Sequence, residues 1–493
     1  MTDATWTGFD ARGLALAVRR GDVSPVEALD ATLAAVDALG ETVGAFAAVT
    51  ADLARAQAVA AQDALVAARR SGSLHDLPPF LGVPCPVKDL TMVAGVPLRA
   101  GSAAIEVTAP YDDGVVTLLR RAGTIMVGKT STPELGLPPY TEPDTGPPAR
   151  TPWDLSRSAG GSSGGAGAAV AAGIVPVAHG SDGGGSLRIP ASACGLVGLK
   201  PSRGLVSPGP YGVDGPGLAS HGVLTRTVRD TAAFLDVLAQ PWPGDTFVSG
   251  CAGRGPTTYL DACERPPLVR VGLLTAPIIA TDAPVDPACR QAALDTAHLL
   301  EELGHEVVEI DPPFDAERWS SFAALWSVGA LSAEIDPEDE HLLTPLSRWL
   351  RARGRDVTGL EHARALTAVQ TLTREVAAAW AGVDVVLSPT LAQLPARVGS
   401  QREDHDPAAD FAAQSAFTPW TSVWNLTGRP AISLPLGEAT ADGVRLPVGV
   451  MLGAAHGQDA VLLALAAQLE TAAPWAHRRP PVHATTRLPT GPR

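Results

Sequence analysis

Residues 158–190 read SAGGSSGGAGAAVAAGIVPVAHGSDGGGSLRIP and place two glycine-rich loops, each containing serine, on either side of an apolar Ala/Val segment. The second loop is an unbroken triplet, Gly183, Gly184 and Gly185, followed directly by Ser186. Glycine loses the most conformational freedom on folding, so this density indicates a backbone with a specific task. Adjacent N–H groups without side-chain cover can hold a negatively charged oxygen beside a nucleophilic hydroxyl. The enclosed apolar run argues against the alternative, a flexible linker.

The composition is that of a globular chain. Its 493 residues predict two or three domains, and 45% hydrophobic with 18% charged residues leaves ample apolar surface to bury. The net charge of −15 argues against nucleic-acid and anionic-membrane partners. The sequence has no signal-peptide pattern, no run of about 20 apolar residues, and five scattered cysteines without a CxxC pair. We therefore expect a cytoplasmic protein, monomer or homodimer, without disulfides, metal or cofactor.

Lysine is rare in this chain. Of the 37 lysine and arginine residues, three are lysine: Lys88, Lys129 and Lys200. Arginine keeps its proton in proteins, whereas a buried lysine can lose it. One of the three lysines is therefore a candidate base, and Lys88 is favoured because it ends a predicted strand. Packing or ion pairs are the expected roles of Lys129 and Lys200.

Short apolar runs alternate with helical patterns from residue 81 onward. This alternation predicts an α/β fold, with a central mixed, twisted β-sheet covered by α-helices on both faces. A capping box at Ser24 predicts a helix up to Gly40, and a second helix is expected at residues 51–70. Further helices are expected at residues 114–122, 166–173, 286–303, 361–381 and 458–471. Strands are expected at residues 82–87, 124–127, 174–178, 269–274, 306–310, 383–387, 431–436 and 448–452.

The chain divides by composition into four regions. Residues 1–80 are expected to be a helical segment packed on the core, and residues 81–240 hold the core with both glycine loops. Residues 241–400 begin with a Pro/Gly/Thr-rich loop and continue with tryptophan-bearing helical patterns, which predicts an insertion that forms a cap over the site. Residues 401–493 are expected to complete the α/β core.

The candidate nucleophile needs a base, because a serine hydroxyl is a weak nucleophile until its proton is removed. His179 lies near the triplet, but its expected role is that of a packed side chain at a strand end. A desolvated lysine can serve instead, since burial disfavours the charged ammonium. Ser162, in the first glycine loop, is then a candidate bridge that relays the proton from Ser186 to Lys88.

Three other motif readings are weaker. GGSSG at residues 160–164 matches the nucleophile elbow of α/β-hydrolases, but the segment before it does not read as a strand. GTIMVGKT at residues 123–130 matches the P-loop pattern, but its middle residues predict a strand instead of a phosphate-binding loop. The 11 histidines are dispersed and form no H-E-x-x-H pattern, which argues against a zinc hydrolase of that type.

Taken together, these motifs resemble the amidase signature family, whose members use a Ser–cisSer–Lys triad. The resemblance extends over most of the chain. It runs through VKD at residues 87–89, GGSSGG at 160–165, DGGGSLRIP at 182–190, GLKP at 198–201, LTGRPA at 426–431 and PVGV at 447–450. Within the family, residues 141–143 and 243–247 most resemble the hydrolases of nylon oligomers, and the chain is also similar to bacterial urethanases.

The resemblance implies roles for the residues in these motifs. Ser186 would be the nucleophile, Ser162, in a cis peptide, the proton shuttle, and Lys88 the neutral general base. The N–H groups of the residues from Gly183 to Ser186 would form the oxyanion hole; these residues are Gly183, Gly184, Gly185 and Ser186. The loops would be braced by hydrogen bonds from three further residues, Ser163, Asp182 and Arg188.

The substrate pocket is less strongly encoded. Pro138, Tyr140 and Tyr211 adjoin the signature loops and are predicted to line the pocket, with loop stiffening as the alternative role. Ser131, Thr151 and Gly183 depart from the common family pattern. The small residue at position 183 would leave room for a bulky acyl or carbamoyl group.

The resulting expectation is a serine hydrolase of C–N acyl bonds. Its substrates would be small amides, anilides and carbamates, cleaved with water through an acyl- or carbamoyl-enzyme on Ser186. Two alternatives stay open: a hydrolase restricted to cyclic or linear nylon oligomers, and an A-type subunit of an amidotransferase. The acidic charge weighs against the second, because that subunit works on a tRNA-bound substrate.

Overall fold

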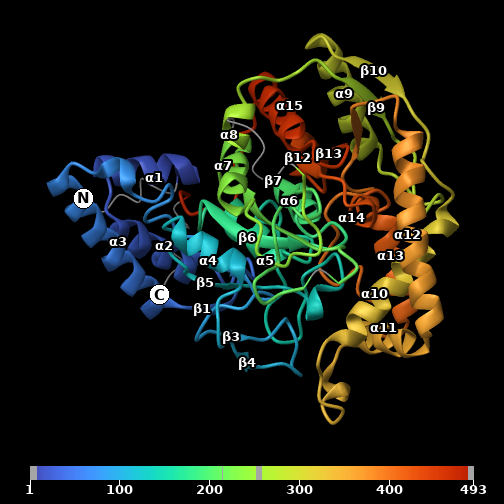
Figure 1. Cartoon of the computed structure of the whole chain (residues 1–493), viewed down its shortest axis with the longest axis horizontal. Coiled ribbons are helices and arrows are strands. Elements are labelled where there is room, and N and C mark those ends of the chain that lie inside the picture. Colours follow the sequence, from blue (N-terminus) through green and yellow to red (C-terminus); the bar gives the residue numbers. More distant parts are fainter. Residues whose placement is uncertain (1–7, 214, 251–257, 487–493) are drawn as a thin grey trace.

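The computed structural model describes residues 8–213, 215–250 and 258–486. Its centre is an eight-stranded sheet in the order β10-β9-β11-β13-β12-β7-β8-β6 (Figure 1). Strand β9 pairs in parallel with β10 and β11, and the other neighbours are antiparallel, so the sheet is mixed as predicted. The strands are β6 (Val177–Asp182), β7 (Val197–Lys200), β8 (Ser220–Thr225), β9 (Arg270–Leu273), β10 (Glu306–Glu309), β11 (Val385–Pro389), β12 (Ala431–Ala441) and β13 (Val444–Ala454).

Helices cover both faces of this sheet, because successive side chains of a strand point to opposite sides. Val450 of β13 packs in the large apolar cluster to which α9 (Pro287–Glu302) and α15 (Asp459–Ala472) contribute. The neighbouring glycines of β13 face the opposite way. A Cβ on Gly449 would lie 2.4 Å from Ser192 of α6 (Arg188–Cys194), and one on Gly453 would lie 2.1 Å from Trp424 of α14 (Ser422–Thr427). This confirms the predicted α/β architecture.

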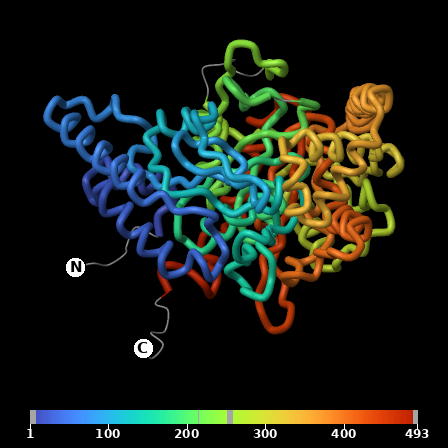
Figure 2. Tube along the Cα trace, turned by 90° about the horizontal axis from the view of Figure 1, so that it is seen from below, coloured from blue at the N-terminus to red at the C-terminus, as the bar shows by residue number. Residues whose placement is uncertain are grey.

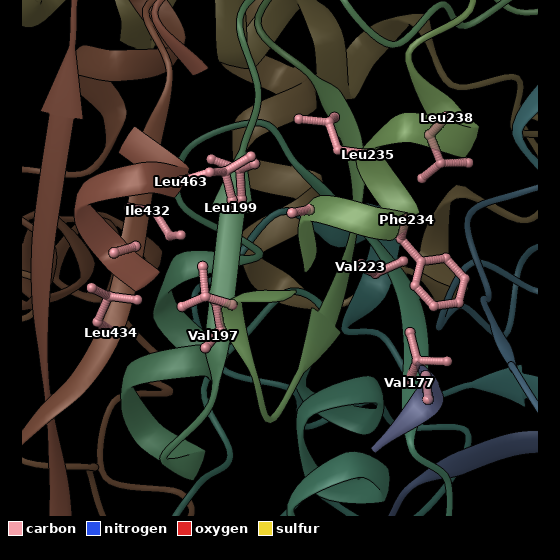
Figure 3. Packing of buried hydrophobic residues seen from close by; sticks show 14 of the residues in the cluster. Val177, Val197, Leu199, Val223, Phe234, Leu235, Leu238, Ile432, Leu434 and Leu463 are labelled. Atoms are coloured by element: carbon pink, nitrogen blue, oxygen red, sulfur yellow. The ribbon is translucent and has the colours of Figure 1, made fainter. Parts of the chain in front are cut away.

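The buried core on the first face joins segments that are far apart in sequence (Figure 3). Val197 and Leu199 of β7, Ile432 of β12 and Leu463 of α15 belong to it. Phe234 of α7 (Val228–Leu238) packs in the same cluster and stacks on Phe80 with ring centroids 3.9 Å apart. Burial of apolar area on this scale is the main stabilising contribution to the fold.

Two groups of helices stand at opposite ends of the long axis (Figures 1 and 2). One end holds α1 (Ala11–Arg20), α2 (Pro25–Leu39) and α3 (Ala51–Ser71). The predicted capping box is present, since the Ser24 hydroxyl accepts from the N–H of Glu27 and the Glu27 carboxylate accepts from the N–H of Ser24. The other end holds α10 (Ser320–Ser332), α11 (Pro345–Asp356), α12 (Gly359–Ala379) and α13 (Pro407–Phe417).

A smaller sheet connects the N-terminal helices to the core and carries Lys88. Its order is β1-β5-β2, formed by β1 (Phe46–Val49), β5 (Gly128–Thr130) and β2 (Val87–Lys88). The strand predicted at residues 82–87 is confined to its last residue and Lys88, because Pro84 and Pro86 have no N–H to donate to a ladder. The strand predicted at residues 124–127 forms instead at Gly128–Thr130, and Ile125 is joined to Pro84 by an isolated parallel bridge.

The remaining elements complete the connections. They are β3 (Pro97–Leu98), β4 (Val107–Thr108), α4 (Gly114–Arg121), η3 (Glu134–Gly136), α5 (Gly164–Ala171), α8 (Tyr259–Ala262), η2 (Leu74–Asp76), η4 (Ala316–Trp319) and η5 (Glu340–Leu342). Strands β9, β10 and β11 lie within the predicted cap region of residues 241–400 but belong to the same sheet as β6, β7 and β8. The predicted boundary at residue 240 therefore does not separate two sheets.

Three observations concern only the residues that the structure describes. No helix in residues 8–213, 215–250 and 258–486 combines the length and apolar character that a membrane crossing requires. Over the same ranges, no group of three or more His, Cys, Asp or Glu side chains is arranged to hold a metal ion. The cysteines at 85, 194, 263 and 289 are buried free thiols, and the fifth, Cys251, lies outside the described residues.

Candidate active site

Lys88 lies at the end of β2 and is completely buried. Its Nζ is 2.8 Å from the Ser162 Oγ, 3.2 Å from the Ser181 Oγ and 3.4 Å from the Ser181 carbonyl oxygen. The pairing of β2 with β5 fixes the backbone of Lys88, and the contact of β2 with β6 aims the side chain at the glycine loops. The amine thus has one hydroxyl partner on the first glycine loop and another on strand β6.

The environment of Lys88 favours the neutral amine. Burial lowers the pKa of Lys88 to about 7, against the opposing charge of Asp182, which raises it. The backbone N–H of Lys88 faces the Nδ1 of His179, and the His179 Nε2 lies 3.1 Å from the Nδ1 of His221. Burial holds the pKa of both histidines below the usual value. His179 is therefore a packed side chain, as predicted, and brings no positive charge to the lysine at neutral pH.

Ser162 follows a cis peptide bond between Gly161 and Ser162. The first glycine loop is packed tightly, since a Cβ on Gly161 would lie 2.8 Å from the backbone of Tyr140. The next residue, Ser163, donates its hydroxyl to the Ser181 carbonyl at 3.1 Å. Ser163 therefore ties the first glycine loop to the end of β6, which leads into the glycine triplet.

Asp182 organises the second glycine loop. Its Oδ1 accepts from the N–H of Gly185 at 2.8 Å, and its Oδ2 accepts from the N–H of Leu187 at 3.1 Å. Arg188 donates through Nε and Nη2 to the two oxygens, each at 2.9 Å, and both side chains are fully buried. Such a paired fork is the strongest geometry for an Arg–carboxylate contact. The predicted bracing residues Asp182 and Arg188 are thus in direct contact.

Asn425 of α14 joins this network. It donates to the Oδ1 and to the carbonyl oxygen of Asp182, each at 2.9 Å, and accepts from Arg188 at 2.8 Å. Burial raises the pKa of Asp182, but the charge and hydrogen bonds of Arg188 and the amide of Asn425 together hold that pKa below its ordinary value. The loop is therefore fixed by a carboxylate that stays ionised.

The backbone N–H groups of the triplet differ from one another. The N–H of Gly185 is engaged by Asp182, which corrects the predicted four-donor oxyanion hole at this position. Among the described residues, no acceptor bonds the N–H groups of Gly183, Gly184 or Ser186. Position 185 requires glycine, because its φ is +139° and a Cβ there would lie 2.7 Å from the Cδ1 of Ile189. Three donors next to the Ser186 hydroxyl remain available to a ligand.

A pocket opens beside Ser186, and none of the described residues that line it carries a charged side chain. The lining residues are Leu137, Pro138, Pro139, Gly184, Ser186, Ile189, Ile279, Trp319, Phe322, Trp326, Phe411, Gln414, Ser415, Thr418 and Ser422. Aromatic rings form one wall: Phe322 lies between Trp319 and Trp326, with ring centroids 5.1 Å away on each side. This wall comes from η4 and α10, within the region predicted as a cap.

The three predicted pocket residues have different positions. Pro138 lines the pocket as predicted. Tyr140 is buried behind the lining, and its hydroxyl donates to the Oδ2 of Asp410 at 2.7 Å. Tyr211 is 57% exposed, and its ring packs against Tyr111 with centroids 4.0 Å apart. Tyr211 therefore lies outside this lining, because its loop packs toward residue 111 and not toward the triplet.

The other two lysines have structural contacts, as predicted. Lys129 forms a buried ion pair with Asp89 at 2.9 Å and donates to the Thr91 carbonyl. Lys200 donates to the carbonyl of Pro201 at 2.7 Å. Burial lowers the pKa of Lys200 to about 7 as well. A shifted pKa alone therefore does not distinguish Lys88; its contact with Ser162 does.

Sequence reasoning missed several residues of the site. Ser181 and Asn425 stood inside or beside quoted motifs, but nothing local showed that they would face Lys88 and Asp182. The aromatic wall was visible only as tryptophans on helical patterns. Gln414 gave no signal, since α13 reaches the pocket only through the tertiary fold.

The comparisons with known proteins identify the family of this chain. The amidase family pattern matches residues 27–463, and the chain belongs to the amidase signature family. It is 38% identical over 496 residues to the 6-aminohexanoate-cyclic-dimer hydrolase of Paenarthrobacter ureafaciens, with 96% of each chain covered. The solved structure of 6-aminohexanoate cyclic dimer hydrolase superposes with a TM-score of 0.87 at 34% identity, covering 97% of this chain and 99% of the other. A bacterial aryl acylamidase superposes with a TM-score of 0.82 at 25% identity, covering 95% and 97%. The chain is accordingly an amidase-family hydrolase that acts on amide bonds.

Proposed function

We propose that this protein is a serine hydrolase that cleaves uncharged amides and carbamates through an acyl- or carbamoyl-enzyme on Ser186. The observation that carries the proposal is the 2.8 Å contact between the Nζ of Lys88 and the Oγ of Ser162. It joins the buried amine of Lys88, whose pKa is lowered, to the hydroxyl of Ser162. The loop that carries Ser162 packs against the glycine triplet. The N–H of Ser163 reaches the carbonyl oxygen of Ser186 at 3.3 Å, so the two loops meet at the candidate nucleophile.

The proposed reaction moves one proton along this line. As the Ser186 Oγ bonds to the substrate carbonyl carbon, its proton passes to Ser162, and the Ser162 proton passes to the neutral Nζ of Lys88. The N–H groups of Gly183, Gly184 and Ser186 receive the developing oxyanion. The C–N bond breaks when the leaving nitrogen takes the proton back by the same route. Water then repeats the sequence on the acyl-enzyme and frees Ser186.

The uncharged pocket supports uncharged substrates. A cyclic dimer has neither a free amine nor a free carboxylate, so the substrate named for the 6-aminohexanoate-cyclic-dimer hydrolase fits this property. A linear oligomer carries a charge at each end, and burying an unpaired charge is costly. Aryl amides and aryl carbamates are supported by the aromatic wall beside Ser186. Carbamates present the same carbonyl to the three N–H donors and are the second proposed class.

The experiment is a substrate panel with the purified protein. An aryl amide, the matching aryl carbamate, a cyclic nylon dimer and a linear nylon dimer are incubated with the wild type and with Ser186→Ala. Turnover of the amide and the carbamate that disappears in the variant is the expected result. A fluorophosphonate probe should add to Ser186 by mass spectrometry.

Other outcomes would assign the chain elsewhere. Turnover of the nylon dimers alone would favour the restricted hydrolase. Inactivity on the whole panel together with an unlabelled Ser186 would contradict the proposed chemistry and favour an amidotransferase subunit that needs partner chains. Ser192→Ala serves as the matched control, because that buried hydroxyl bonds to the N–H of Gly449 and not to the triad.

A further inference from the structure

Part of the pocket wall comes from α13, whose Phe411 stacks on Trp319 with ring centroids 6.0 Å apart and whose other lining side chains are polar. Phe411, Gln414 and Ser415 of α13 line the pocket, and Thr418 lines it just after the helix ends. The hydroxyl of Ser415 donates to the carbonyl of Phe411, and the hydroxyl of Thr418 donates to the carbonyl of Gln414. Both hydroxyls are therefore satisfied within the helix. Gln414 is the polar member of this wall whose side chain bonds to another side chain, that of Asp410 one turn earlier in α13.

Gln414 is oriented by a buried carboxylate. Its Nε2 donates to the Oδ1 of Asp410 at 2.6 Å, and the other oxygen of Asp410 accepts from the hydroxyl of Tyr140 at 2.7 Å. The backbone N–H of Glu403 also donates to Asp410, at 3.1 Å. Asp410 thus accepts hydrogen bonds from three donors through its two oxygens, and the amide of Gln414 turns its nitrogen toward this acceptor. The carbonyl oxygen of Gln414 is consequently the end turned away from Asp410.

Tyr140 remains the donor in its hydrogen bond with Asp410. Burial, followed by the charge of Asp410, raises the pKa of Tyr140, so its phenol keeps its proton and remains a donor. The side chains of Asp410 and Gln414 are both buried. No donor among the described residues bonds the Oε1 of Gln414. The pocket wall therefore presents a fixed acceptor without a protein partner.

We propose that Gln414 is a specificity-determining residue: its Oε1 accepts a hydrogen bond from an N–H of the bound substrate. The site then prefers flat, uncharged substrates that carry this N–H, such as secondary anilides and N–H aryl carbamates, over their N-alkylated analogues. The inference rests on the proposed function of Ser186. An N-alkylated analogue leaves the acceptor desolvated and unpaired, and sites built around a substrate donor discriminate strongly against such analogues.

The test compares an aryl carbamate bearing N–H with its N-methyl analogue. Intrinsic reactivity differs between the two compounds, so the informative quantity is the change in their kcat/KM ratio between variants. Gln414→Leu should lower this ratio by about tenfold, mainly through the N–H substrate. Tyr140→Phe should lower it about threefold, because the positioning of Asp410 is weakened while Gln414 is retained. The matched control Ser192→Ala, whose hydroxyl lies outside the pocket lining and accepts from the N–H of Gly449, should leave the ratio unchanged.

A binding measurement separates this inference from the proposed chemistry. In a Ser186→Ala background, calorimetry gives the affinity for both compounds with and without Gln414→Leu. A selective loss of affinity for the N–H compound supports the acceptor role even if the wild type turns over neither compound. Equal changes for the two compounds, or an unchanged ratio in both assays, would overturn it. Thermal midpoints confirm that each variant is folded, and Tyr140→Phe keeps the test decisive if Gln414→Leu does not fold.

Discussion

Replacing Lys88 with methionine should strongly reduce turnover and at the same time stabilise the protein at neutral pH. The unfolded chain holds this lysine near the ordinary pKa of 10.5, and the folded protein holds it at about 7. The native state therefore binds fewer protons than the unfolded state between these two values, so stability rises with pH across that window. At pH 7 the buried amine costs about 4 kcal/mol as an upper bound.

Methionine removes this cost but also removes the contacts with Ser162 and Ser181. Each such hydrogen bond contributes about 1 kcal/mol, so a net gain of about 1–2 kcal/mol is expected at pH 7. The gain should shrink and reverse as the pH approaches the ordinary pKa of 10.5, because the cost of deprotonating the lysine on folding falls toward zero there. Turnover should fall by about 10²–10⁴-fold, the usual contribution of a general base.

The assays are thermal midpoints at pH 7 and pH 10 and kcat/KM on an aryl amide. Lys200→Met is the matched control, because burial lowers the pKa of Lys200 to about 7 but its amine bonds to the Pro201 carbonyl and not to the triad. This variant should be more stable than the wild type and keep the wild-type pH–rate profile. The reasoning is refuted if Lys88→Met is less stable than the wild type at pH 7, or if it keeps more than about a tenth of the wild-type rate.

The remaining predictions concern the base, the braced loop and the periphery. The wild-type kcat/KM should rise with pH up to about 7 and then level off, because the Lys88 amine must be neutral. Asp182→Asn should destabilise the fold by about 3–5 kcal/mol in chemical denaturation, since it leaves the buried Arg188 without its charge partner. Gly185→Ala should remove labelling by a fluorophosphonate, because its Cβ would strike Ile189. Ser24→Ala should lower stability by about 1 kcal/mol and leave kcat/KM unchanged.

Local chemistry made part of the site predictable. The capping box at Ser24 and the glycine at position 185 depend on the local backbone conformation. Such features can be recognised from residues that are close together in the sequence. The order of the signature motifs placed Lys88, Ser162 and Ser186 in one proposed site before any distance was known. Strand positions were less certain where prolines interrupt pairing, as at Pro84 and Pro86, because the ladder then begins only where N–H donors resume.

The strands β7 and β8 were not predicted as strands at all. Their residues include Gly198 and Gly222, which leave room for Leu187 between β7 and β8 and the loop above them. The sequence alone indicates weak strands at these positions, because glycine in a strand interior weakens the strand. Their conformation is imposed by pairing with β12 and β6, which lie far away in sequence.

By itself, then, the sequence determined which residue types stand at the glycine loops and which lysine follows the short strand. Only the tertiary structure decided that Lys88 is shielded from solvent, that Asn425 hydrogen-bonds to Asp182, and that Gln414 lines the pocket. The physical reason is that desolvation and hydrogen-bond partnership depend on what surrounds a group in space. Tyr140 and Asp410 illustrate this, because 270 residues separate two side chains that lie 2.7 Å apart.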